Sequence, residues 1–139
     1  MLAAPAKAQQ VEWRGGGFLS SLTQACLDDG YKEHEYVSVR YRPKGFGSNG
    51  SQSRIGFFHP LFFATSYAIN GNFAKSFKPV QGGGTSAGTF LFETTMKLTQ
   101  KPSKLTDSTP SVELSGQIRN YGGTPDCTMA FEVNLTRRP

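Results

Sequence analysis

The most regular pattern of apolar and polar residues lies near the end of the chain, between residues 111 and 136. Val112, Leu114 and Ile118 alternate with polar residues, and the alternation resumes after a glycine-rich turn. A period of two over this length is typical of half-buried antiparallel strands. In the second strand, the residues expected on the apolar side are Cys127, Met129, Phe131, Val133 and Leu135.

Similar patterns predict further strands along the chain. These strands are expected over 34–42, over 53–69 as two short strands bent at His59-Pro60, and over 89–99. Pro43 ends the first of them, because proline cannot donate to a strand ladder. Asn70-Gly71 is a strong two-residue hairpin signal and predicts a tight hairpin that leads into 72–78.

The segments between these strands are read as loops, with one candidate helix. Residues 44–52 and 79–88 are glycine-rich and are expected to be exposed. Residues 9–17 are interpreted as a polar lead. The next apolar residues are spaced as on one face of a short helix ending near Gly30, with an irregular strand as the alternative. These residues are Phe18, Leu19, Leu22 and Cys26.

About seven to eight strands with at most one short helix predict an all-β fold, either an antiparallel β-sandwich or a closed β-barrel. A chain of 139 residues suits one domain. We expect that domain to span 9–139, with 1–8 as the remnant of a signal peptide or a disordered lead.

The distribution of charge limits the classes of binding partner that the sequence predicts. The net charge is +5, but Lys and Arg are spread along the chain and Arg137-Arg138 is their only tight pair. Specific nucleic-acid binding usually clusters basic residues, so it is not expected here. A polyanionic surface or an acidic glycan stays compatible with the charge. No apolar run approaches the roughly 20 residues of a transmembrane helix.

The two cysteines, Cys26 and Cys127, predict a disulfide. Such a bond persists in an oxidising compartment, and two free buried cysteines are the alternative. Ala6-Lys7-Ala8 has the small-x-small form of a signal cleavage site, although the residues before it hold no apolar core. Together these features predict an extracytoplasmic protein, periplasmic or secreted.

Two segments match known sequence motifs but lack the secondary structure that these motifs require. Gly45–Gly50 spells a dinucleotide-binding fingerprint and Gly84–Gly88 a nucleophile elbow, but neither leads into a predicted helix. Both are therefore interpreted as glycine loops. His34 and His59 lack metal-ligand spacing, and His59 is expected to be a half-buried structural residue. We predict no catalytic residue, no cofactor and no metal ligand.

Aromatic residues beside flexible loops are the best candidates for a binding surface, because rings bury much area at low entropic cost. The alternative is that these rings cap the ends of the core. The candidates are Trp13, Tyr31, Phe46 and Tyr121.

The first functional hypothesis is a non-catalytic, secreted or envelope-associated β-sandwich that acts as a binding or assembly module. Its expected partner is another protein or a second copy of the chain, with contact through exposed apolar residues such as Tyr36 or Leu91, or through a free edge strand. The second is a carrier of a small hydrophobic ligand in a barrel cavity, and the third a structural or decoration subunit of a larger particle. An enzyme would require His34 or His59 beside a carboxylate in a pocket.

Overall fold

The computed structural model describes residues 10–60, 63–73, 77–83 and 93–139. The expected signal remnant and the Gly84–Gly88 motif lie outside these residues, as does Leu91. All statements below concern the described residues.

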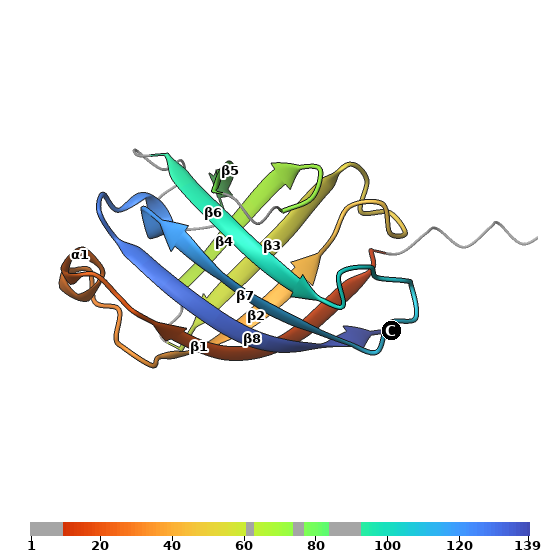
Figure 1. Ribbon diagram of the computed structural model, residues 1–139, viewed down its shortest axis with the longest axis horizontal. Helices are drawn as coiled ribbons and strands as arrows, with labels where there is room; N and C mark the ends of the chain where they lie inside the picture. The colour runs from red at the N-terminus through yellow and green to blue at the C-terminus, as the bar shows by residue number, and fades with distance from the viewer. Residues whose placement is uncertain (1–9, 61–62, 74–76, 84–92) are drawn as a thin grey trace, which may run out of the picture.

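Eight antiparallel strands form a closed barrel, and each strand pairs with the next one along the chain (Figure 1). A short helix, α1, lies between β1 and β2, and a 3-10 turn at Tyr121–Gly123 lies between β7 and β8. The strands are β1 (Glu12–Ser20), β2 (Tyr36–Arg42), β3 (Gln52–His59), β4 (Phe63–Asn70), β5 (Lys78–Gly83), β6 (Thr94–Lys101), β7 (Ser111–Arg119) and β8 (Thr128–Arg138). The all-β prediction is confirmed. Of the two predicted alternatives, sandwich and closed barrel, the fold is the closed barrel.

The barrel closes because β1 pairs with β8 from Glu12–Arg138 to Ser20–Ala130. This contradicts the prediction of a polar lead over 9–17. The three glycines that suggested a loop lie inside β1, where the backbone of β8 passes very close. A Cβ on Gly15 or Gly17 would collide with a carbonyl oxygen of β8. Glycine therefore permits this pairing.

The predicted helix exists but is shorter than expected. Phe18 and Leu19 belong to β1, and α1 covers only Gln24–Asp28. Gly30 follows with a φ of 100°, in the left-handed region that glycine adopts at the ends of helices.

The predicted tight turn at Asn70-Gly71 is wrong, although β4 does pair antiparallel with the next strand, β5. Gly71 forms a bridge with Gln52, and its carbonyl accepts a hydrogen bond from the Ser53 hydroxyl at 2.7 Å. The dipeptide therefore ends β4. β5 begins only at Lys78 and occupies part of the segment predicted as the second glycine loop.

The predicted inward faces of β2 and β8 are confirmed, since the residues expected to point inward are all buried. Aliphatic and aromatic side chains fill the interior together. The largest fully buried aromatic residues are Trp13, Phe57, Tyr67, Tyr121 and Phe131.

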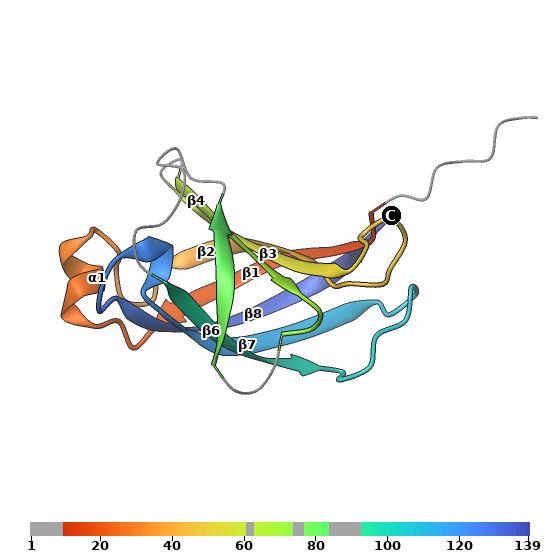
Figure 2. The same cartoon turned by 90° about the horizontal axis from the view of Figure 1, so that it is seen from above.

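The two ends of the barrel differ. Figures 1 and 2 both place α1 at one end and the C-terminus at the other. We call the first the α1 end, formed by 21–35 and 120–127. We call the second the open end, formed by 43–51, 71–73 and 102–110.

Candidate functional site: a pocket at the open end of the barrel

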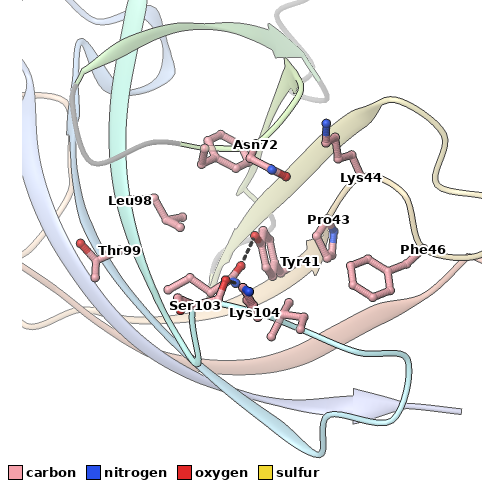
Figure 3. A pocket seen from close by; sticks show the side chains of 12 residues that line it. Tyr41, Pro43, Lys44, Phe46, Asn72, Leu98, Thr99, Ser103 and Lys104 are labelled. Atoms are coloured by element: carbon pink, nitrogen blue, oxygen red, sulfur yellow. Dashed lines mark hydrogen bonds between the residues drawn. The ribbon is translucent and has the colours of Figure 1, made fainter.

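A pocket of about 530 Å³ lies at the open end, among segments that are distant in sequence (Figure 3). β2 and β6 contribute residues from the barrel wall, and the three open-end segments surround them. Apolar and polar side chains both line the pocket. Such a mixture suits a ligand with both an apolar and a polar part.

The apolar part of the lining comes from four segments. Leu98 points inward from β6 and is buried. Phe46, Phe73 and Leu105 are half-buried and pack against the edge of the core. Phe46 also meets the ring of Trp13 edge-on, with centroids 5.8 Å apart. The pocket is thus continuous with the hydrophobic core.

A hydrogen-bonded pair lies beside these apolar residues. The Tyr41 hydroxyl donates to Gln100 Oε1 at 2.6 Å (Figure 3). The Gln100 amide donates to the carbonyls of Pro102 and Ser103, each at 3.1 Å, which holds the 102–110 connection in place. Burial raises the pKa of Tyr41, so this hydroxyl stays protonated at neutral pH.

A second anchor holds the 43–51 segment against the barrel. The Asn49 amide donates to the carbonyls of Val11 and Pro43 at 2.8 and 2.7 Å. The Val11 N–H donates back to Asn49 Oδ1 at 3.0 Å. This loop is therefore tied to Val11, just before β1, while most of its residues are exposed, as expected from the sequence.

Two lysines complete the pocket. Lys44 and Lys104 both line it and are exposed. Lysine keeps a flexible, hydrated ammonium group. The pocket therefore combines an apolar wall with positive charge at its solvent side.

Of the predicted surface aromatics, only Phe46 lies in this pocket. Trp13, Tyr31 and Tyr121 are buried in the core, at 0%, 7% and 0% exposure, which corrects their assignment to a binding surface and supports the alternative that these rings belong to the core. Trp13 is buried because it lies within β1, and its indole N–H donates to the Thr109 carbonyl at 2.8 Å. The sequence analysis did not single out the other pocket residues, because they are spread over separate segments.

Tyr31 and Tyr121 instead form a buried cluster with His59 at the α1 end. His59 Nε2 lies 2.6 Å from the Tyr121 hydroxyl, and its Nδ1 lies 3.2 Å from a carboxylate oxygen of Glu35. Burial lowers the pKa of His59, and the nearby Glu35 charge opposes this effect. The Tyr31 ring packs against both His59 and Tyr121, with centroids 5.0 and 5.1 Å apart.

An enzyme would need a carboxylate beside one of the two histidines, and Glu35 lies in that position next to His59. The sequence did not point to this residue. His59, however, is 8% exposed and Tyr121 is fully buried. This arrangement seals the α1 end of the barrel with hydrogen-bonded rings. His34, the other histidine, is exposed in the turn before β2.

The predicted disulfide joins Cys26 of α1 to Cys127, the residue before β8. Among the described residues, no group of three or more His, Cys, Asp or Glu could hold a metal ion. In the same part of the chain, no helix is long and apolar enough to cross a membrane.

Comparison of the chain with protein-family models, with curated proteins and with solved structures found no match.

Proposed function

We propose that this protein is a non-catalytic binding protein that holds a small amphipathic anion in the open-end pocket. The observation that carries this proposal is the pocket itself, which places apolar side chains and two lysines around one space of about 530 Å³. Pockets for small molecules commonly span about 300–1,000 Å³.

The barrel interior favours this site over a deep cavity. Eight-stranded barrels are either filled by side chains or hold one small ligand. Here aromatic and aliphatic side chains fill the interior, and Tyr121 with His59 closes the α1 end. The hydrophobic-carrier hypothesis from the sequence therefore becomes a proposal for a ligand at the mouth.

The lining favours an amphipathic anion over a neutral hydrocarbon. An apolar group would pack on Leu98 and Phe73, while its acidic group would lie near Lys44 or Lys104. A carboxylate or sulfonate would gain charge-assisted hydrogen bonds there. A neutral hydrocarbon would remove the polar Tyr41–Gln100 pair from water and offer it no hydrogen bond in return, which costs free energy.

Two fluorescent probes of similar shape test this proposal: anionic 1-anilinonaphthalene-8-sulfonate and neutral N-phenyl-1-naphthylamine. Lys44→Gln with Lys104→Gln should weaken binding of the anionic probe by about tenfold and leave the neutral probe nearly unchanged. The matched control, Lys78→Gln with Lys101→Gln, removes two exposed charges outside the pocket lining. It should have little effect on either probe.

A blocking variant locates the site. Ser103→Trp places a large ring in the pocket from an exposed position in its lining, and it should abolish binding of both probes. Unchanged binding of the anionic probe in either pocket variant would reject the open-end pocket as its site.

We also propose that the protein works outside the cytoplasm, periplasmic or secreted, because the Cys26–Cys127 disulfide is stable in an oxidising compartment. Alkylation of free thiols in freshly lysed source cells, followed by intact mass measurement, tests this. Two alkylated cysteines would contradict it. The other hypotheses, an assembly module or a structural subunit, depend on an exposed docking face, and the pocket does not bear on them.

A further inference from the structure

One outer face of the barrel carries most of the exposed large apolar side chains. Phe18 on β1, Tyr36 on β2 and Phe58 on β3 are 55%, 51% and 38% exposed, and only Leu27 joins them among the described residues. Phe18 lies directly opposite Tyr36 across the β1–β2 pair, with ring centroids 5.8 Å apart. Single exposed apolar residues are ordinary, but a cluster of them indicates an interaction surface.

A recess of about 390 Å³ lies within this face, lined by Tyr36, Phe58, Arg14, Arg40 and Arg138 among others. The Tyr36 side chain lies directly over Gly16, where a Cβ would collide with the Tyr36 hydroxyl. The Arg40 guanidinium lies 5.6 Å from the centroid of the Phe58 ring. We call the surface formed by Phe18, Tyr36, Phe58, Arg14 and Arg40 the basic aromatic face.

This face keeps a net positive charge. Glu12 is the carboxylate that faces three guanidinium groups, those of Arg14, Arg40 and Arg42, at 2.9, 3.2 and 3.7 Å. Burial alone would raise the pKa of Glu12, but the hydrogen bond from Arg14 and the three positive charges hold it below its usual value. A second carboxylate, Glu132, lies on β8 opposite Phe18 and is exposed. Arg138 also lines the recess, so four arginines stand against two carboxylates, and two such faces would repel each other.

The fourth exposed apolar residue, Leu27, lies on α1 at one end of the barrel (Figure 1). It is 42% exposed, and Asp28 and Asp29 follow it directly. We call these three residues the acidic tip. Two more exposed acidic residues, Glu33 and Asp126, lie in the segments that form the same end, together with Lys32. Acidic side chains therefore outnumber basic ones in these segments.

The acidic tip is held in place before any binding. The disulfide joins Cys26, the residue before Leu27, to Cys127. The Thr124 hydroxyl also donates to an Asp29 carboxylate oxygen at 2.9 Å. A surface that is already ordered loses less conformational entropy on binding.

We propose that the acidic tip of one copy docks on the basic aromatic face of a second copy. Leu27 would enter the recess, and Asp28 and Asp29 would meet Arg14 and Arg40. The two surfaces match in charge and in apolar character, and the charge of the face disfavours a symmetric face-to-face pair. The strands of this face, β1, β2 and β3, are each paired on both sides and offer no edge for a further strand, so side chains make this contact.

A contact between two different surfaces leaves one of each free, so it continues as a ring or an open chain. Sedimentation velocity and native mass spectrometry of the full chain, from about 10 µM to 1 mM, should show species larger than a dimer. Raising NaCl from about 50 to 500 mM should weaken the association by about tenfold, because the contact depends on exposed charges.

Charge reversal followed by mixing identifies the two surfaces. Asp28→Lys with Asp29→Lys makes both surfaces basic, and Arg14→Glu with Arg40→Glu makes both acidic. Each variant alone should be monomeric, and an equimolar mixture should associate again. Lys78→Glu with Lys101→Glu carries the same change in net charge as the arginine variant, away from both surfaces, and should associate like the wild type.

Two milder variants guard against misfolding. Leu27→Ser and Tyr36→Ser change exposed side chains without changing charge, and each should reduce association at least tenfold while the thermal unfolding temperature stays nearly constant. A wild-type protein that is monomeric at every concentration overturns the proposal. A dimer that persists in both charge variants, or variants that stay monomeric when mixed, overturns it too.

Discussion

Removing the Cys26–Cys127 disulfide should cost the fold much of its stability. The bond joins residues 101 positions apart. In the chain-entropy description, closing a loop of this length in the unfolded chain contributes about 4–5 kcal/mol. Domains of this kind are stable by about 5–15 kcal/mol in total. Cys26→Ser with Cys127→Ser should therefore fold, with a much reduced free energy of unfolding.

The structure indicates that the variant keeps its native contacts near α1. The Thr23 N–H donates to the Thr128 carbonyl at 3.0 Å, and the Thr23 hydroxyl donates to the Asp126 carbonyl at 2.6 Å. The Thr128 N–H donates to the Thr23 hydroxyl at 3.0 Å. These bonds hold 21–35 to the start of β8 without the disulfide, so the loss acts mainly through the unfolded chain.

Urea unfolding followed by tryptophan fluorescence measures the effect. Trp13 is the single tryptophan and is fully buried. Trp13 lies near the open end, whereas the disulfide lies at the α1 end. Its fluorescence therefore reports unfolding of the barrel and not a local change beside the disulfide. The variant should unfold at lower urea with a steeper dependence on urea, because its unfolded chain exposes more surface. Wild type that is reduced and alkylated should behave like the variant.

A loss below about 1 kcal/mol would refute this reasoning. It would mean that the unfolded chain is already compact enough for the two cysteines to lie close together, or that the native bond is strained. A comparable loss in free energy with no change in the urea dependence would point to a defect in the folded state instead.

Three further predictions concern the barrel itself. Phe131→Ala should lower the free energy of unfolding by about 3–5 kcal/mol, because its ring is 1% exposed and packs against Phe57 at 5.2 Å; a loss below about 1 kcal/mol in urea unfolding would contradict this packing. Gly17→Ala should sharply reduce the folded yield, because its Cβ would collide with the Glu132 carbonyl; a variant with wild-type circular dichroism and melting temperature would show that β1 tolerates a side chain there. Burial lowers the pKa of His59 from its ordinary 6.5, so the unfolded state binds more protons below about pH 6.5. The melting temperature should therefore hold above that pH and fall as pH drops below it, and His59→Asn should remove most of this fall; a parallel pH dependence in both proteins would exclude His59 as its source.

Much of the barrel wall could be predicted from the sequence alone. In β8, Met129, Phe131 and Val133 follow a period of two, and this pattern depends only on burying one side of one strand. The inward faces of β2 and β7 were found in the same way. The disulfide followed from the presence of only two cysteines and the apolar side on which Cys127 lies.

The sequence misled where a residue's role depends on a distant partner. Gly15 and Gly17 look like a loop until β8 is placed beside them, and only the barrel closure explains why glycine is needed. Trp13 was assigned to a flexible lead for the same reason. Asn70-Gly71 has the composition of a hairpin, but its contacts with β3 make it the end of a strand.

Local periodicity thus determined that the chain is an antiparallel β-protein and which side of most strands faces inward, because burial acts on each strand separately. The tertiary structure decided the closure of the barrel, the assembly of the pocket and the separation of charge between the acidic tip and the basic aromatic face. Lys44 and Lys104 are 60 positions apart in sequence, and so cannot be grouped by spacing. They share a pocket because successive strands reverse direction, which brings alternate connections to the same end of the barrel.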